Sequence, residues 1–173
     1  GTLSDIDAVL ATGADNTSRY FEYYFGKYPH IIRKNRNSIA VLDGAESGSE
    51  LEALGSDVFS YFGLGCRNVS KIFIPQNFDL KRLSDIWKKY SGLINHSKYA
   101  NNYDFNKAVY LVNKDKFTDT GYLLLKENSG LSSPVAVLFY ELYDSLRQIK
   151  MLLETQKEKI QCIVGRNFLS FGK

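Results

Sequence analysis

Residues 59–71 read FSYFGLGCRNVSK and contain a change from a helical to a strand pattern, on which the interpretation of the fold depends. The residues before the Gly63–Gly65 turn end an amphipathic helical pattern, and the turn breaks that pattern directly before Cys66. Residues 71–74 then alternate as a strand, which Pro75 ends. A helix that leads through a turn into a buried strand is a building unit of α/β sheets.

Outward from that unit, strand-like and helical segments alternate along the chain. The helix before the turn is expected over residues 50–62, with Ser49 as its N-cap and Glu52 completing a capping box. Further strands are expected at residues 8–11, 30–32, 38–42, 122–125, 135–140 and 160–164. One further helix is expected to follow the turn at residues 12–17 and to end near residue 25, and three more are expected at residues 79–90, 103–112 and 145–157. This alternation predicts an α/β fold with a largely parallel sheet flanked by helices.

The composition is that of a globular chain and argues against several classes of protein. Of the 173 residues, 44% are hydrophobic and 24% are charged, and the net charge is +3. No apolar run approaches the ~20 residues of a membrane-spanning helix. The basic residues do not form the dense stripe of a nucleic-acid surface. The first five residues lack the basic and apolar regions of a signal peptide, so a cytoplasmic protein is expected.

The two cysteines lie in different contexts. Cys162 belongs to the apolar run 160–164 and is expected to be a small buried hydrophobe. Cys66 follows a Gly-x-Gly turn that leaves room for a ligand, and Arg67 and Lys71 are near enough in sequence to favour its thiolate. Neither cysteine has a Cys or His at metal-ligand spacing, so no metal site is expected. Cys66 is the candidate nucleophile, with an inert structural thiol as the alternative.

Residues 59–71 resemble the nucleophile segment of the aldehyde dehydrogenase superfamily, in which a helix leads into a Gln-x-Cys-like turn and then a strand. The closer similarity is to the acyl-CoA reductases of the fatty-acid reductase complexes of luminous bacteria. Four other segments resemble parts of these proteins in the same order. They are 11–17, like a strand–Thr-Gly-Ser–helix phosphate turn; 35–42, like the entry to the catalytic domain; 95–104, like a stretch typical of acyl-CoA reductases; and 171–172, like the Pro-Phe-Gly after the catalytic domain.

This resemblance implies a reaction and a set of site residues. Cys66 is implied to accept the acyl group of acyl-CoA, or one delivered by a partner acyltransferase or synthetase, as a thioester that NADPH or NADH reduces to a fatty aldehyde. Thr12, Gly13 and Ala14 are implied at the cofactor phosphates. Glu127, in a stretch like Glu-x-Phe-Gly-Pro, is implied at the nicotinamide ribose. No metal is implied, and a homo-oligomer is expected.

Residues 33–38 depart from the pattern of the hydrolytic aldehyde dehydrogenases. Those enzymes carry Glu-Leu-Gly-Gly-Lys there, and the Glu activates water, whereas this segment has no carboxylate. In a reductase the thioester must persist until the hydride is transferred, and a base that activates water would hydrolyse it first. The absence of that base therefore favours a reductase. Residues 1–173 are expected to form a single thiol-bearing catalytic domain, with most of the cofactor domain upstream.

Three alternatives stay open. Cys66 with His96 as base would make a thioesterase or acyltransferase. The chain would otherwise be a non-catalytic interaction or assembly module, or an acylating aldehyde dehydrogenase for short acyl groups. The 12 tyrosines and 11 phenylalanines are expected in core packing, with the lining of a long acyl-chain site as the other interpretation.

Overall fold

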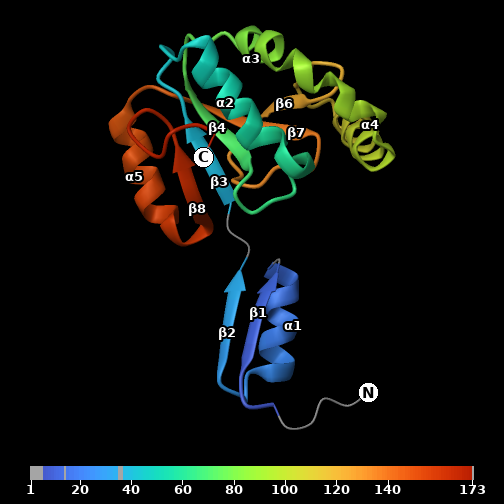
Figure 1. Ribbon diagram of the computed structural model, residues 1–173, viewed down its shortest axis with the longest axis vertical. Helices are drawn as coiled ribbons and strands as arrows, with labels where there is room; N and C mark the ends of the chain where they lie inside the picture. The colour runs from blue at the N-terminus through green and yellow to red at the C-terminus, as the bar shows by residue number, and fades with distance from the viewer. Residues whose placement is uncertain (1–5, 14, 35–36, 173) are drawn as a thin grey trace. The chain divides into compact units, whose positions relative to one another are not determined.

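The computed structural model describes residues 6–13, 15–34 and 37–172, which fall in two compact units, Gly1–Arg36 and Asn37–Lys173 (Figure 1). The smaller unit contains strand β1 (Val9–Gly13), helix α1 (Asp15–Phe25) and strand β2 (His30–Lys34). β1 and β2 pair in parallel, which the intervening helix makes possible. Leu10 lies opposite Ile31 in this pair, and both side chains are exposed.

The larger unit is built on one sheet of six strands in the order β5-β6-β7-β4-β3-β8. All of its strands run parallel except the short β5, which pairs antiparallel with β6. The strands are β3 (Asn37–Val41), β4 (Val69–Pro75), β5 (Thr118–Asp119), β6 (Leu124–Glu127), β7 (Val137–Tyr143) and β8 (Ile160–Val164). The helices are α2 (Gly48–Phe59), α3 (Lys81–Ile86), α4 (Ser97–Val112) and α5 (Leu146–Gln156), with 3₁₀ turns at Ser60–Gly63, Trp87–Asn95 and Lys157–Lys159.

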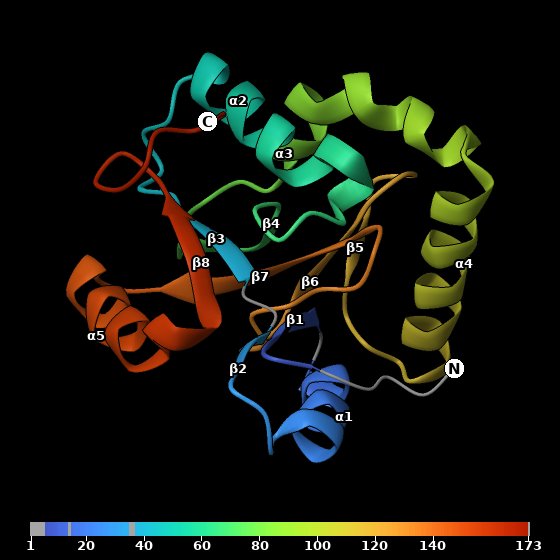
Figure 2. The ribbon, with the colours of Figure 1, turned by 60° about the horizontal axis from the view of Figure 1, so that its bottom comes forward.

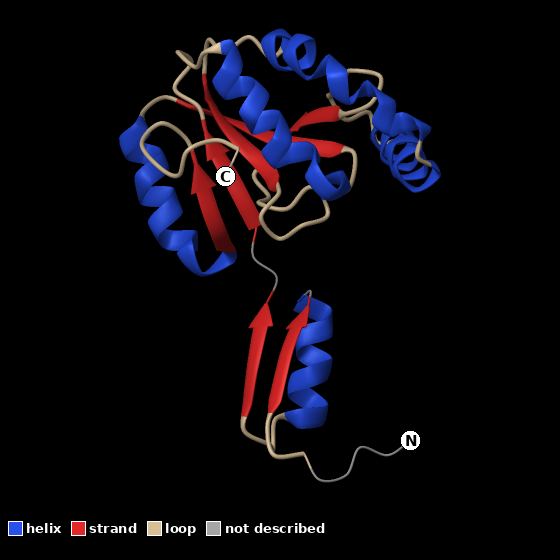
Figure 3. Ribbon diagram, in the orientation of Figure 1, coloured by secondary structure: helices blue, strands red, loops and turns tan. Residues whose placement is uncertain are grey.

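Helices lie on both sides of this sheet, as Figure 3 shows. On one face, α2 and α3 pack with the central strands through side chains such as Leu54, Leu83 and Ile72. On the other face, α5 packs on β3 and β4 through Ile149 and Leu153. α4 lies beside β5 and β6 (Figure 2), where its tyrosines Tyr99, Tyr103 and Tyr110 contact apolar residues of β6 and β7. The predicted α/β fold with a largely parallel sheet flanked by helices is confirmed.

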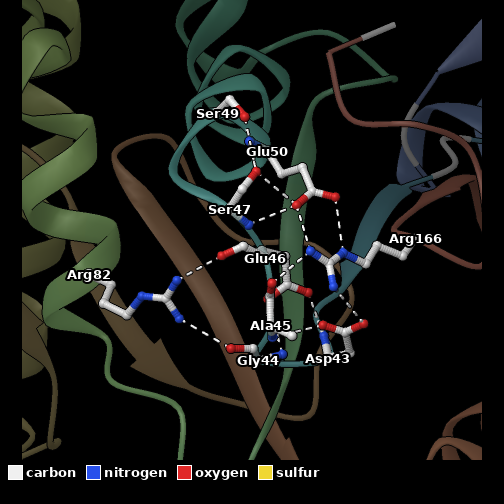
Figure 4. A network of polar contacts seen from close by, with 9 residues as sticks. All are labelled: Asp43, Gly44, Ala45, Glu46, Ser47, Ser49, Glu50, Arg82 and Arg166. Atoms are coloured by element: carbon white, nitrogen blue, oxygen red, sulfur yellow. Dashed lines mark hydrogen bonds and ion pairs between the residues drawn. The ribbon is translucent and has the colours of Figure 1, made fainter.

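A polar network fixes the start of α2 at the carboxyl end of β3 (Figure 4). The buried carboxylate of Glu46 accepts hydrogen bonds from the backbone N–H groups of Asp43 and Gly44. Arg82 donates to the carbonyl oxygens of Gly44 and Glu46, and Arg166 donates to Glu50 at 2.8 and 3.0 Å. These contacts tie α2, α3 and the segment after β8 together, so the N-terminal end of α2 is held in place.

Several predicted boundaries are wrong by a few residues. Ser47, not Ser49, is the N-cap of α2, and Glu50 completes the capping box. That helix ends at Phe59 rather than near residue 62. The helix expected at 79–90 is only α3, continued by a 3₁₀ segment, and α4 starts earlier than expected, at Ser97. Strand β5 was not expected from the sequence.

Within the described ranges, every helix is too short or too polar to span a bilayer. The prediction that residues 1–173 act as one catalytic domain without most of its cofactor domain stays a prediction.

Candidate active site around Cys66

Cys66 lies in a tight turn that connects α2 to β4. The N–H of Asn68 donates to the carbonyl of Gly65 at 2.9 Å, and the Gly65 N–H donates back to the Asn68 side chain at 2.8 Å. The Asn68 amide also donates to the carbonyl of Asp57 in α2 at 2.9 Å. A side chain at Gly65 would come within 2.6 Å of the Asn68 oxygen, so the Asn68 side chain that closes the turn would have to shift. The turn therefore presents Cys66 and Arg67 at its corner, where both are exposed.

The approach to this turn is strained. Tyr61, Phe62 and Gly63 all have left-handed backbone angles, with φ of 50°, 60° and 74°. Glycine adopts this conformation readily, but each bulky residue there costs about 1–2 kcal/mol. Strain of this kind concentrates at functional sites, where surrounding packing holds it. From the sequence, only Gly63 was expected to break the helix, and the left-handed backbone of Tyr61 and Phe62 was not predicted.

Ser38 of β3 holds the Cys66 turn through a hydrogen bond. Its fully buried hydroxyl donates to the Cys66 carbonyl at 3.0 Å, from 28 residues away. The same hydroxyl accepts a hydrogen bond from the Cys162 thiol at 3.0 Å. Cys162 lies in strand β8 as expected, but it is half-buried rather than buried, and its inert structural role stays a prediction. That Ser38 joins the two cysteines was not predictable from local patterns, because their contact depends on strand register.

Lys71 does not serve the Cys66 thiol in the expected way. Its side chain is fully buried, and its ammonium group donates to the Glu141 carboxylate and to the Asn128 carbonyl. Burial lowers the pKa of Lys71, and Glu141 partly offsets that effect. Arg67 remains the basic neighbour that is exposed beside Cys66.

A cavity of about 510 Å³ opens beside the strained segment. Its lining is largely apolar and comes from the Cys66 loop, from the start of α4 and from the segment before β7. The lining residues are Phe62, Leu64, His96, Ser97, Lys98, Tyr99, Asn102 and Val135. Leu64 lies two positions before Cys66, so the cavity borders the turn that carries the thiol.

His96 forms one wall of this cavity and precedes α4. Its ring packs edge-on against Phe62, with centroids 4.9 Å apart. In the part of the chain that the structure describes, no hydrogen bond joins His96 to Cys66. The pairing of nucleophile and base that a thioesterase would use is therefore not formed here.

Glu127 ends β6 and is exposed. The strand register puts it level with Tyr140 of β7 and, through β7, with Ile72, the fourth residue of β4. The segment that follows returns across the sheet, held by Lys71 at the Asn128 carbonyl and by Ser70 at the Leu131 carbonyl. It ends at Val135 in the cavity wall. The role of Glu127 at a cofactor ribose stays a prediction.

The residues expected at the cofactor phosphates lie in the smaller unit. β1 ends at Gly13 and α1 begins at Asp15, so the predicted strand–turn–helix order is present. Ala14 and the Thr12 side chain lie outside the described residues, as do the side chains of residues 33–36. Among the described residues, no group of His, Cys, Asp and Glu could hold a metal ion.

The fold matches solved structures of aldehyde dehydrogenases. An indole-3-acetaldehyde dehydrogenase from Pseudomonas syringae, complexed with NAD⁺, aligns with a TM-score of 0.63 over 85% of this chain at 11% identity. A Mycobacterium tuberculosis aldehyde dehydrogenase complexed with NAD⁺ aligns with a TM-score of 0.59 over 85% of the chain at 12% identity. A P. syringae aldehyde dehydrogenase with NAD⁺ and octanal aligns with a TM-score of 0.60 over 82% at 12% identity. The chain has the aldehyde dehydrogenase fold.

The match covers only part of those proteins. The alignments span 37%, 38% and 37% of the three solved chains, respectively. No protein-family sequence model matches this chain, and no curated protein sequence matches it. The similarity is therefore one of fold.

Proposed function

We propose that this chain carries the thiol-bearing site of an NAD(P)H-dependent acyl-CoA reductase, which converts a fatty acyl-CoA to a fatty aldehyde through a thioester on Cys66. The observation that carries the proposal is the exposed Cys66 in a turn that Asn68 and Ser38 hold from both sides. The aldehyde dehydrogenase fold supports it, because the solved proteins of that fold named above contain NAD⁺.

In the first step the Cys66 thiolate attacks the acyl carbonyl, and the bond from that carbon to the sulfur of CoA breaks. CoA leaves as a thiolate and takes up the proton that the Cys66 thiol lost, and the acyl group remains on Cys66. Negative charge develops on the carbonyl oxygen during the attack and needs a hydrogen-bond donor. Within the described residues, the Cys66 N–H donates to no protein group, so it is available for that oxygen.

The bound nicotinamide cofactor would supply the hydride that reduces the acyl group. For that cofactor the chain offers the β1 end at Thr12 and Gly13 followed by α1, and the exposed carboxylate of Glu127. A helix N-terminus after a strand is suited to a phosphate. The acyl carbon then leaves the Cys66 sulfur as the aldehyde, and the thiol is restored.

The cavity beside Leu64 supports a substrate with an aliphatic chain. Its apolar walls and its volume of about 510 Å³ suit a hydrocarbon chain better than a polar group. One of the solved proteins of this fold contains octanal, which is an aliphatic aldehyde.

The test is intact-mass measurement of the full-length protein after incubation with a long-chain acyl-CoA. We expect one acyl adduct on the wild type and on Cys162→Ala, none on Cys66→Ala, and removal of the adduct by hydroxylamine. Absence of an adduct on the wild type would overturn the covalent mechanism. An adduct on the wild type that decays to the free fatty acid without any cofactor would favour a thioesterase instead.

A further inference from the structure

Ser38 is joined to both cysteines of the chain through a single hydroxyl group. A serine hydroxyl has one hydrogen to donate and lone pairs to accept. The hydrogen is directed at the Cys66 carbonyl at 3.0 Å, and a lone pair accepts from the Cys162 thiol at 3.0 Å. Ser38 is completely buried, so water does not compete for these bonds.

The strand pairing at Ser38 is irregular on both sides. Towards β4, Ser38 pairs with Val69 and Ile39 pairs with Lys71, so Ser70 is an extra residue. Towards β8, Asn37 pairs with Ile160 and Ser38 pairs with Cys162, so Gln161 is an extra residue. Bulges redirect side chains and are frequent next to active sites. Here they flank Ser38, whose side chain holds the carbonyl of the candidate nucleophile.

The bond from Ser38 restrains the peptide plane that follows Cys66. The Asn68 backbone N–H restrains the peptide before Cys66, because it donates to the Gly65 carbonyl of that peptide at 2.9 Å. With both peptides held, the direction of the Cys66 N–H within the turn is fixed. That direction decides whether the N–H meets the oxygen of a carbonyl under attack.

We propose that Ser38 is a positioning residue that holds the Cys66 backbone N–H ready for the developing oxyanion, and that the Cys162 thiol orients the Ser38 hydroxyl. This inference rests on the proposed function. It assigns Ser38 no contact with substrate, because the side chain is buried and acts through Cys66.

The test compares two reactions of the same sulfur in the full-length protein. Acylation by a long-chain acyl-CoA creates an oxyanion, whereas alkylation by iodoacetamide creates none. In Ser38→Ala we expect acylation to slow by about 10- to 100-fold, the effect of a misdirected catalytic group. The alkylation rate of Cys66 and its pH profile should stay within about twofold of wild type, because the thiol and its exposure are unchanged.

Three variants complete the design. Ser38→Thr keeps the hydroxyl and should recover most of the acylation rate, and Cys162→Ala should lose part of it. Ser70→Ala is the matched control, because it removes a hydroxyl at the same end of the sheet that bonds to the Leu131 carbonyl at 2.7 Å and to the Ser38 carbonyl at 3.4 Å, but not to Cys66 or to the Ser38 hydroxyl. Thermal melts identify any variant that is unfolded at the assay temperature, and its rate is then measured below its melting temperature.

The outcomes separate this inference from the proposed function. If the wild type is not acylated, both the proposed function of Cys66 and the positioning role of Ser38 are wrong. If the wild type is acylated and Ser38→Ala is acylated at the same rate, only the proposed role of Ser38 is wrong. Parallel losses of acylation and alkylation in Ser38→Ala, or an equal loss in Ser70→Ala, also overturn it, since either result indicates a general disturbance of the fold.

Discussion

Lys71 of β4 and Glu141 of β7 form an ion pair across the middle of the sheet, with the Lys71 side chain entirely buried. The same ammonium group donates to the Asn128 carbonyl at 2.9 Å, so the pair also holds the start of the segment that crosses the sheet after β6. A buried charge needs such partners, because its removal from water is costly.

Replacing Glu141 by Gln should therefore destabilise the protein strongly. Loss of one partner of a buried pair costs about 3–5 kcal/mol, and the lower end applies here because Glu141 is 33% exposed. Urea unfolding of the variant measures this loss. The double variant Lys71→Met with Glu141→Gln removes both charges and should be more stable than Glu141→Gln alone. A loss below about 1 kcal/mol in the single variant would show that the pair is solvent-screened.

The Arg166–Glu50 contact predicts a change of stability with pH. The hydrogen bond from Arg166 is the main reason that the pKa of Glu50 falls from 4.5 to about 2 in the folded protein. Since the folded pKa is the lower one, the contact stabilises the fold fully above the unfolded value of 4.5 and loses its effect as the pH falls towards 2.

Unfolding of the wild type and of Glu50→Gln over that pH range measures this effect. The wild type should be the more stable of the two at neutral pH, and the two unfolding free energies should converge as the pH falls. A difference that stays constant from neutral pH down to the folded pKa would contradict the assignment. The same series in an Arg166→Met background should show a smaller pH dependence.

Two glycines of α2 should respond to alanine with opposite signs. A methyl group at Gly55 would lie 2.8 Å from the rings of Trp87 and Tyr90, and Trp87 is buried with its indole bonded to the Leu51 carbonyl. Overpacking of this kind costs about 1–3 kcal/mol. At Gly48 nothing lies within 4 Å of the added carbon, so Gly48→Ala should stabilise the helix by up to about 1 kcal/mol. Thermal melts of the two variants test the pair, and equal signs would refute the packing argument.

The two thiols should react at different rates. Cys66 is exposed, whereas Cys162 is half-buried and donates to Ser38. Iodoacetamide should modify Cys66 faster, on the order of tenfold or more. Mass spectrometry of peptides after brief labelling gives the ratio. A Cys66→Ser variant should lose the fast phase and Cys162→Ser should keep it; faster labelling at Cys162 would indicate that β8 opens readily.

The sequence predicted the sheet and the position of Cys66 because both depend on local patterns. Alternating apolar residues and glycine turns located most strands to within a few residues. The start of α2 was missed because Ser47 and Ser49 each have a glutamate three residues on. Local capping rules do not distinguish them; Arg166, distant in sequence, binds Glu50 and thereby favours Ser47. Lys71 was assigned to Cys66 for the same reason, since its actual partner, Glu141, lies 70 residues away.

The proposed substrate predicts a length-dependent effect of the cavity wall. Asn102 lines the cavity from α4 and is exposed, so Asn102→Trp should narrow the cavity with little effect on the fold. Exclusion of two or three methylene groups, at about 0.8 kcal/mol each, should slow thioester formation by long-chain acyl-CoA by about 10- to 60-fold. Acetyl-CoA has no chain to exclude and should react at the wild-type rate. Asn101→Trp is the matched control, because Asn101 is also exposed on α4 but does not line the cavity. If Asn102→Trp slowed both substrates equally, or Asn101→Trp behaved the same way, the acyl chain would have to bind elsewhere.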